Sequence, residues 1–306
     1  MATSQSNDFL YETKKLIDKE TGELVSGVFI PAELTHDYRI TPKAKIDAYY
    51  KKKEATEGLI YFNKLAGDSF TFSLKESVRE LFQNNDFSDA EKVHIIYLGS
   101  YVNYDGYLMT KNNQIMTKKL LREKVKIKNK DRFYQFYNKL LHLNFIDENE
   151  GKIYWNNNMC FKGSPKKNGT SSSKVFKTYD EMIQRLYKMH QPKSIAIIYR
   201  LIPYLNKYHN VICKYSDEME YEKCVPYGIS EVAELLGIKD YRNLKAKLRR
   251  IRLDDEYIFS FRQTGTGTTV IINPFLVWLS TYAPASNLIG DFSLAKAKLL
   301  EERREY

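Results

Sequence analysis

The chain has 306 residues, of which 43% are hydrophobic, and this is enough to bury sizeable cores in two domains. A net charge of +10 and a pI near 9.1 favour a polyanionic partner, such as nucleic acid or an acidic membrane face. No apolar run approaches the roughly 18 residues of a membrane span, and the first residues lack the pattern of a signal peptide, so we expect a cytoplasmic protein that does not enter a membrane.

The N-terminal part is predicted to consist of hairpins and extended chain. Two strand-like arms flank a Gly-containing turn over residues 15–25, which indicates a β-hairpin. Residues 36–56 are polar and basic with little periodicity, and no element is assigned to them. Residues 58–62 and 70–72 flank a turn and predict a second hairpin, after which Ser73 is the candidate N-cap of a short helix.

Two later stretches, residues 93–161 and 195–275, read as copies of one design. Each opens with Ile-Ile-Tyr, at residues 95–97 and 197–199, followed by an aromatic residue, an apolar residue and Asn. Each copy then has a basic helix-turn-helix and a short β-hairpin. Self-similarity of this size indicates a repeated folding unit. The pattern fits a winged helix-turn-helix, whose usual role is to put one helix into the DNA major groove.

In the first copy, Ser88 is the candidate N-cap of helix one. Helix two is predicted at residues 117–124. Asn129 is the expected cap of helix three, which covers residues 130–143, and the wing hairpin follows at residues 145–155. The residues expected on the buried face of helix three are Phe133, Tyr137 and Leu140.

In the second copy, a connecting helix at residues 178–190 precedes helix one at residues 195–205. Helix two is predicted at residues 230–236, helix three at residues 241–252 and the wing at residues 257–272. The residues expected to point inward from helix three are Leu244, Leu248 and Ile251.

The predicted fold class is α+β, mostly α, with tandem winged helix-turn-helix domains and an N-terminal β-hairpin region. The Gly-, Ser- and Pro-rich stretch at residues 163–173 is the best linker, because such a composition does not offset the entropy of ordering. The predicted boundaries are an N-terminal region at 1–72, a first winged-helix domain at 73–163, a linker at 164–177, a second winged-helix domain at 178–285 and a C-terminal helix at 286–306.

The excess charge is concentrated on the same element twice. Residues 117–132 contain eight basic and two acidic residues, and residues 239–252 contain seven basic residues and one acidic residue. A solvated helix face, which is the alternative interpretation, ordinarily mixes its signs. Arg reads guanine and Asn or Gln reads adenine, while Lys holds phosphate. The candidate DNA-binding residues are Lys118, Lys119, Lys128, Lys130, Arg132, Gln135, Lys139, Lys239, Arg242, Asn243, Lys245, Arg249, Arg262 and Thr266.

Arg262 and Thr266 belong to the wing of the second copy. Thr266 lies in a Thr- and Gly-rich tip, which is predicted to lie along the minor groove or the phosphate backbone. Arg262 stands at the edge of that tip and is expected to enter the groove.

The sequence predicts neither a catalytic residue, nor a metal, nor a cofactor. Common nucleophile and metalloprotease motifs are lacking, and His209, Cys213 and Cys224 have no fourth ligand at a suitable spacing. Three scattered cysteines do not make a disulfide framework. The alternative of a tyrosine nucleophile that cuts or joins DNA stays open, because the chain has 24 tyrosines.

Residues 10–165 resemble the RepL-type replication proteins of Gram-positive plasmids and their phage relatives. The resemblance rests on the run Tyr101-Val102-Asn103-Tyr104-Asp105-Gly106 before the helix-turn-helix and on the ending Phe161-Lys162-Gly163 after the wing. The chain departs from the pattern in having Asn157 or Asn158 where Pro is common. A second winged-helix copy is also the layout of the larger plasmid initiators. The resemblance implies a role in replication initiation.

The leading hypothesis is a non-enzymatic, sequence-specific protein that binds double-stranded DNA at a plasmid or phage replication origin. One alternative is a phage transcriptional regulator with the same domains, since fold alone does not set function. Another is a module that binds a polymerase or a host protein. Further candidate partners are the replication or transcription machinery and a second copy of the chain in a homodimer.

Overall fold

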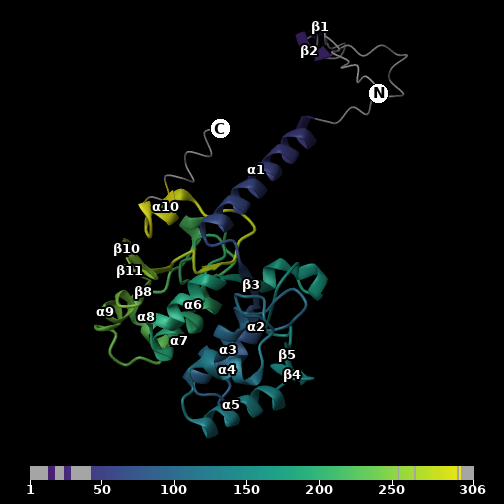
Figure 1. Cartoon of the computed structure of the whole chain (residues 1–306). Helices are drawn as coiled ribbons and strands as arrows, with labels where there is room; N and C mark the ends of the chain where they lie inside the picture. Colours follow the sequence, from purple (N-terminus) through teal and green to yellow (C-terminus); the bar gives the residue numbers. More distant parts are fainter. Residues whose placement is uncertain are drawn as a thin grey trace, which may run out of the picture. The chain divides into compact units, whose positions relative to one another are not determined.

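The computed structural model describes residues 13–17, 24–28, 43–253, 255–264, 267–294 and 296–297. The chain divides into two compact units, residues 1–53 and residues 54–306. Figure 1 shows the order of the elements along the chain.

In the first unit, strands β1 (Thr13–Ile17) and β2 (Leu24–Val28) pair antiparallel, with Ile17 opposite Leu24. The predicted N-terminal hairpin is therefore confirmed. Helix α1 (Lys43–Leu65) begins in this unit and continues into the second.

Helix α1 contradicts the prediction of a second hairpin, because it occupies the residues that were expected to form its first strand. Lys, Ala and Glu in its first half favour a helix. Its second half is held by tertiary packing, since Phe62 is fully buried and contacts the rings of Phe275 and Trp278. Gly58 lies close to Ala283, and a Cβ there would be 3.7 Å from the Ala283 Cβ. Of residues 58–62, Phe62 is buried and Ile60 is exposed, so Phe62 anchors this part of the helix.

The second unit is built on a four-stranded antiparallel sheet in the order β12-β7-β3-β6. Its two inner strands are β3 (Phe70–Leu74) and β7 (Val175–Tyr179). The outer strands are β6 (Cys160–Phe161) and β12 (Val277–Trp278). All five residues of β7 are buried. The sheet therefore joins segments more than 100 residues apart in the sequence.

The sheet is symmetric about one residue pair. Phe72 and Lys177 are the third residues of their five-residue strands, and they lie opposite each other. On the outer sides, Phe161 lies opposite Phe72 and Trp278 lies opposite Lys177. Phe72 and Lys177 are therefore equivalent residues that pair with each other. Phe161 and Trp278 are equivalent residues that pair with them from the outer strands. The four-stranded sheet therefore has approximate two-fold symmetry about this pair.

The same sequence of elements follows each inner strand. In the first repeat it is β3, α2 (Lys75–Gln83), α3 (Asp89–Gly99), α4 (Lys118–Val125), α5 (Lys130–His142), the hairpin of β4 (Ile146–Asn149) and β5 (Lys152–Trp155), and β6. In the second repeat it is β7, α6 (Asp180–Met189), α7 (Pro192–Leu201), α8 (Ile229–Leu235), α9 (Leu244–Arg249), the hairpin of β10 (Phe259–Thr264) and β11 (Gly267–Ile272), and β12. The repeats identified in the sequence start at residues 93 and 195. Each structural repeat also includes the strand and the helix that precede that start.

The asparagines of the repeated sequence motif have one structural role in both copies. The Asn103 side-chain oxygen accepts hydrogen bonds from the backbone N–H groups of Asp105 and Tyr107. The Asn206 side-chain oxygen accepts from the N–H groups of Tyr208 and His209 in the same way. Each asparagine therefore holds the turn that follows the apolar helix, which explains why the motif recurs.

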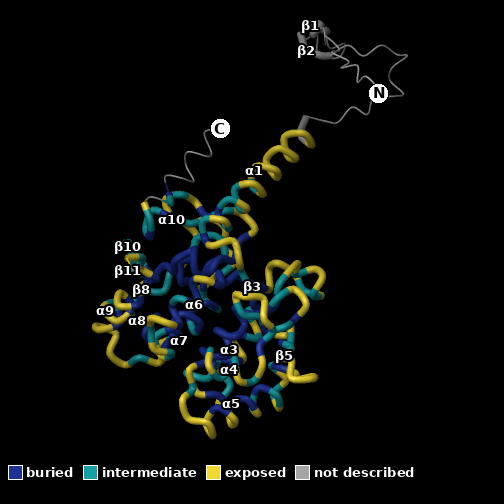
Figure 2. The backbone as a smooth tube through the Cα atoms, in the orientation of Figure 1, coloured by how far each residue is buried: buried dark blue, intermediate teal, exposed yellow. Residues whose placement is uncertain are grey.

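Helices α3 and α7 form the centre of the core and pack against each other. All residues of α3 from Lys92 to Gly99 are buried, and Figure 2 shows the buried interior between the two repeats. The predicted N-cap Ser88 is confirmed as a capping box with Glu91: the Ser88 hydroxyl accepts from the Glu91 N–H at 3.3 Å and the Ser88 N–H donates to the carboxylate at 2.8 Å.

Two other predicted features differ. Ser73 does not cap α2, because it lies in β3 and Leu74 occupies the N-cap position without a side-chain hydrogen bond. The predicted linker 164–177 contains two 3₁₀ turns, η2 (Pro165–Asn168) and η3 (Ser172–Lys174), and ends in the buried strand β7. Residues 175–179 form this strand because they pair with β3, and their own composition did not indicate a strand.

Beyond β12, the described part of the chain has helix α10 (Ser286–Gly290), a turn, and helical residues at 294 and 296–297. The predicted helix beyond residue 297 lies outside the described residues. A short pair of strands, β8 (Arg252–Leu253) and β9 (Glu256–Tyr257), precedes the second hairpin.

Candidate nucleic-acid interface

The first basic segment forms helices α4 and α5 and the tight turn between them. The Thr117 hydroxyl accepts from the Leu120 N–H at 3.4 Å, and the Asn129 side chain accepts from the Arg132 N–H at 2.9 Å. Lys126 has a left-handed conformation with φ +55° and ends α4. The Arg122 guanidinium donates to the Lys128 carbonyl at 2.8 Å. The turn is thus held by caps at both helices and by a side chain across it, and both helices match the prediction.

The apolar sides of these helices are buried, so the residues on the opposite sides of the helices face outward. Phe133, Tyr137 and Leu140 are buried as predicted. The exposed residues among the predicted DNA contacts are Lys119, Lys128, Lys130, Arg132 and Gln135. Within the described ranges, none of the four cations forms an ion pair with a carboxylate. We call these five residues the first basic face.

Lys118 borders this face against two aromatic rings. Its ammonium lies 4.2 Å from the centroid of the Tyr137 ring and 4.8 Å from that of Tyr134. Tyr134 is 40% exposed and also lies 6.0 Å from the Lys130 ammonium. Tyr134 was not predicted as a contact, although its position four residues after Lys130 places both on one side of the helix. The ring of Tyr134 attracts both ammonium groups.

Lys139 was predicted to hold DNA, but the structure gives its ammonium another role. It donates to the Glu91 carboxylate at 3.0 Å and to the Asp86 carbonyl at 2.8 Å. Burial disfavours the charged form of Glu91, yet hydrogen bonds from Ser88 and the Lys139 ammonium outweigh it and hold the pKa of Glu91 below its usual value. Lys139 therefore fastens α5 to the start of α3 and is not part of the first basic face.

The second basic segment has the same arrangement with a shorter last helix. Gly237, at φ +66°, makes the turn after α8. The Asp240 carboxylate then accepts from the Arg242 N–H at 3.1 Å and from the Asn243 amide at 2.7 Å. These local hydrogen bonds compete with helix formation. Helix three was predicted over residues 241–252, whereas α9 covers residues 244–249.

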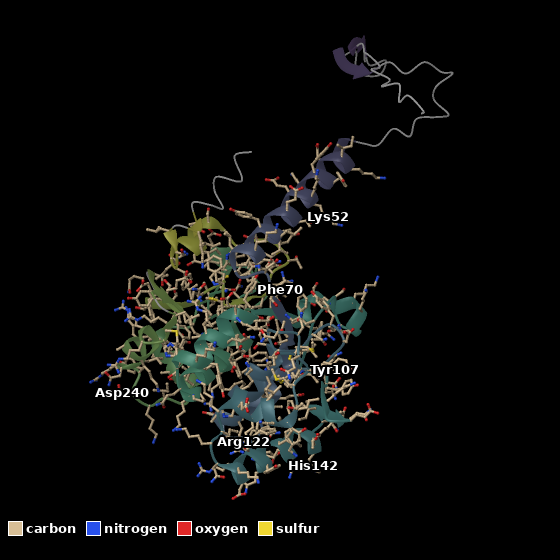
Figure 3. The ribbon with its side chains drawn as sticks, in the orientation of Figure 1. Lys52, Phe70, Tyr107, Arg122, His142 and Asp240 are labelled. Atoms are coloured by element: carbon tan, nitrogen blue, oxygen red, sulfur yellow. The ribbon has the colours of Figure 1, made fainter. Side chains whose placement is uncertain are left out.

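The buried and exposed sides of α9 agree with the prediction. Leu244, Leu248 and Ile251 are buried. The predicted contacts that are exposed are Lys239, Arg242, Asn243 and Arg249, and Lys245 is half-buried. No carboxylate in the described part of the chain forms an ion pair with these cations. We call these five residues the second basic face, and Figure 3 shows Arg122 and Asp240 as markers of the two helix pairs.

The hairpin β10–β11 packs beside α9 through one aromatic ring. The Lys245 ammonium and the Arg249 guanidinium lie 5.4 Å and 5.5 Å from the centroid of the Phe261 ring. The hairpin is therefore in contact with the second basic face. Figure 2 shows the surface of α9 and the adjacent segments as largely exposed.

Arg262, which was predicted to enter a DNA groove, is paired with a carboxylate of the chain itself. Its Nε donates to the Asp291 carboxylate at 2.9 Å, a second guanidinium nitrogen lies 2.7 Å from the same oxygen, and that nitrogen also contacts the Asn287 carbonyl. The guanidinium thus ties the hairpin to the α10 region. Thr266, the other predicted contact of this hairpin, lies outside the described residues.

The described residues contain no group of three His, Cys, Asp or Glu side chains placed to hold a metal ion. The three cysteines are buried and unpaired with one another. Among helices in the described ranges, none has the length and apolar character needed to cross a membrane.

Comparison of the chain with protein-family models, with curated proteins and with solved structures gave no match.

Proposed function

We propose that the chain is a non-enzymatic protein that binds double-stranded DNA through the two basic faces. In this proposal α4–α5 and α8–α9 act as helix-turn-helix pairs, the hairpins β4–β5 and β10–β11 act as wings, and α5 and α9 enter the major groove. The observation that carries the proposal is the recurrence, in two repeats, of exposed cations on the same helix pair that form no ion pair with a carboxylate of the described residues.

The residue types on the faces support recognition of the base sequence as well as electrostatic attraction to DNA. Arg132 and Gln135 on α5, and Arg249 on α9, have side chains that form paired hydrogen bonds to base edges. The lysines supply contacts to phosphate. If roughly six to ten phosphates are neutralised, the logarithm of affinity falls with the logarithm of salt concentration with a slope of about −5 to −9.

The biological role that we propose is initiation of replication at a plasmid or phage origin. The support for it is the resemblance of residues 10–165 to RepL-type proteins and the two-repeat layout, which resembles that of larger plasmid initiators. Regulation of a phage promoter is the second candidate, and the position of the bound sites in the genome distinguishes the two roles.

The test compares charge reversal on each face with reversal of the same number of charges elsewhere. One variant carries K119E, K130E and R132E, and a second carries K239E, R242E and R249E. The matched control carries K166E, K167E and K174E, whose side chains are exposed on η2 and η3. Duplexes selected from a random library by the wild type serve as ligands in fluorescence anisotropy titrations.

We expect each face variant to lose affinity about tenfold or more and the control to change by less than about twofold. Circular dichroism verifies that the variants are folded. Equal affinities for all four proteins would contradict the proposal, and so would binding without salt dependence. Either result would favour a module that binds a polymerase or a host protein.

A further inference from the structure

The turns that follow helices α3 and α7 are built alike but enclose loops of different length. Met109 pairs with Ile115 in the first repeat, and Cys213 pairs with Pro226 at the equivalent place in the second. The loop between the second pair, residues 214–225, is the longer of the two, and we call it the insertion. The insertion is thus the part of the second turn that the first repeat lacks.

The insertion folds back onto its own turn and offers backbone carbonyls to it. The Asn206 side-chain amide donates to the carbonyls of Tyr215 at 3.3 Å and Glu218 at 2.9 Å. The backbone N–H of Lys207 donates to the Ser216 carbonyl at 2.7 Å. Asn206 is fully buried. The donors of this turn are therefore occupied by a segment of the chain itself.

On its other side the insertion faces the start of helix α2. Burial lowers the pKa of Lys75, the first residue of α2, and the charge of Asp217 in the insertion opposes this shift. Lys207 is a second cation close to Lys75, since it acts on the same pKa in the direction of burial. The insertion contains more acidic than basic residues. An acidic segment thus fills a basic place between the Asn206 turn and α2.

The equivalent place in the first repeat, between the Asn103 turn and the start of α6, is an open pocket of about 370 Å³. The turn contributes Asn103, Tyr104 and Lys111 to its walls, and α6 contributes Asp180 and Glu181. A volume of this order is typical of sites that enclose a ligand.

The two donors that hold the insertion in the second repeat are also present in this pocket. The Asn103 side-chain amide, equivalent to that of Asn206, donates within the described residues only to the Asp105 carboxylate, at a long distance of 3.4 Å. The Tyr104 N–H, equivalent to that of Lys207, makes no hydrogen bond to the described part of the chain, and Tyr104 is 80% exposed. Both groups can therefore donate to the carbonyls of a second polypeptide segment.

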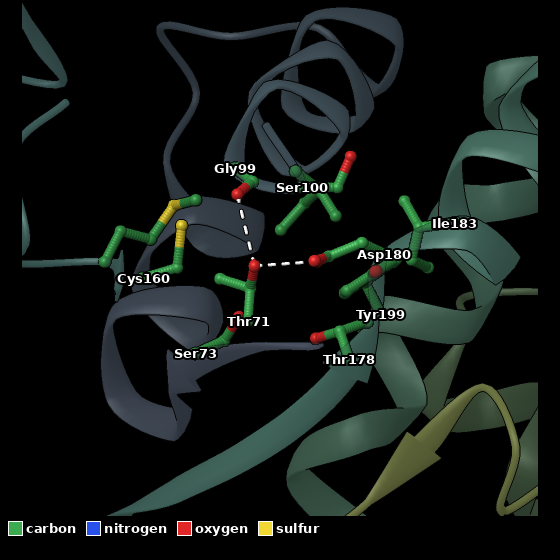
Figure 4. A pocket seen from close by; sticks show the side chains of 11 residues that line it. Thr71, Ser73, Gly99, Ser100, Cys160, Thr178, Asp180, Ile183 and Tyr199 are labelled. Atoms are coloured by element: carbon green, nitrogen blue, oxygen red, sulfur yellow. Dashed lines mark hydrogen bonds between the residues drawn. The ribbon is translucent and has the colours of Figure 1, made fainter. Parts of the chain in front are cut away.

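The charge of the pocket differs from that of the filled place. Asp180 stands at the position of Lys75, and its carboxylate accepts from the Thr71 hydroxyl at 2.7 Å and from the Lys162 ammonium. Figure 4 shows the hydrogen bond from Thr71 to Asp180 in the interior. The neighbouring Glu181 is exposed and forms no ion pair with the described residues. The pocket thus offers a carboxylate where the filled place offers cations.

We propose that this pocket binds an extended peptide segment of a partner protein, with a Lys or Arg side chain against the Glu181 carboxylate. The backbone carbonyls of the segment accept from the Asn103 amide and the Tyr104 N–H, as those of the insertion do in the second repeat. The exposed ammonium of Lys111 favours an acidic residue beside the basic one. This inference goes beyond the proposed DNA binding and does not depend on it.

The test uses the insertion itself as the source of the probe. The two probes are synthetic peptides, one with the sequence of residues 214–222 and one with the same sequence carrying D217K. Isothermal titration calorimetry measures their affinities for the full chain and for its variants E181Q, N103D and E76Q. N103D retains the side-chain oxygen that accepts from Asp105 and Tyr107 and removes the amide donor. E76Q is the matched control, because Glu76 is the exposed residue of α2 equivalent to Glu181.

We expect the D217K peptide to bind the wild type about three- to tenfold more tightly than the unmodified peptide. E181Q should remove this preference, because the preference depends on the pair formed by Glu181 and the new lysine. N103D should weaken the binding of the D217K peptide about threefold or more, because a carbonyl loses its donor. E76Q should change each affinity by less than about twofold. Circular dichroism verifies that the variants are folded.

Three results overturn the proposal. The first is no binding of the D217K peptide to the wild type at about 1 mM peptide. The second is a preference for the D217K peptide that persists in E181Q, because the lysine would then bind elsewhere. The third is an unchanged affinity in N103D, because the carbonyls of the peptide would then not meet the turn.

Discussion

Lys139 and Arg262 illustrate how a carboxylate partner changes the role of a basic residue. Lys139 meets Glu91 and Arg262 meets Asp291, whereas Lys130 and Arg249 form no such pair with the described residues. An ammonium or guanidinium already paired with a carboxylate has to break that pair before it binds phosphate. The sequence predicted all four as DNA contacts, Arg262 from its place at the edge of the wing tip and the others from their places on helix three. Only the partners that the fold brings close separate structural cations from those free to bind.

His94 offers a prediction at the same scale. It is buried in α3, where its Nδ1 lies 2.7 Å from the Tyr187 hydroxyl, and burial lowers the pKa of His94 to about 4. The unfolded chain binds this proton at a pKa of about 6.5. Above about pH 6.5, His94 is neutral in both the folded and the unfolded chain. As the pH falls from about 6.5 to about 4, only the unfolded chain binds the proton, so the free energy of unfolding decreases.

We expect the free energy of unfolding to decrease by about 2–3 kcal/mol between pH 7 and pH 4.5 because of His94. H94Q should lack this part of the decrease, and urea unfolding at both pH values measures it. H142Q, at an exposed position, is the control and should retain the full decrease. The same pH dependence in H94Q and the wild type would contradict the prediction.

At the scale of the element, a close approach between α3 and β6 explains Gly99. A Cβ at this position would lie 2.6 Å from the Cys160 Sγ. Real atoms do not approach so closely, so the helix and the strand would have to separate. We expect G99A to destabilise the protein by about 1–3 kcal/mol, in spite of the better helix propensity of Ala.

The double variant G99A/C160A tests the cause of this loss, because it removes the sulfur and leaves the Cys160 Cβ 4.0 Å away. Chemical denaturation should show that C160A costs less in the G99A background than in the wild type. Purely additive losses would show that another contact limits this position.

The helices of the repeats were predicted well because their own sequences contain the caps and the apolar spacing. Asn129 and Thr117 cap the helices they precede, and Phe133, Tyr137 and Leu140 mark one buried side. The strands of the central sheet were missed or misassigned. Strand β7 has five residues that are all buried, so it has no alternation of polar and apolar positions to reveal it. Its partners are also remote in the sequence.

At the scale of the whole second unit, the approximate two-fold symmetry of the sheet makes a prediction about DNA. If α4–α5 and α8–α9 bind DNA as proposed, two-fold symmetry predicts that they contact one duplex as the subunits of a dimer do, with half-sites about 10 bp apart or a multiple of it. Equivalent positions on α5 and α9 should then face opposite strands. Gln135 and Ala246 are such positions, because each lies two residues after an aligned buried residue, Phe133 or Leu244.

The measurement uses an iron-chelate cleavage probe attached to Q135C or to A246C. The native cysteines are buried, and burial raises the pKa of all three thiols, so the new exposed cysteine reacts selectively. We expect the two probes to cut opposite strands at positions symmetric about the centre of the bound site. Cuts on the same strand would contradict the two-fold arrangement on DNA.

The sequence by itself determined the repeated helices, their caps and the concentration of positive charge on the same helix pair in each copy. These features depend on residues within a few positions of one another, so a local pattern contains them. The tertiary structure alone decided the four-stranded sheet, its approximate two-fold symmetry and the role of cations such as Lys139. These depend on contacts between residues 48 to more than 100 positions apart, such as Lys139 with Glu91 and Phe72 with Lys177, which no local pattern specifies.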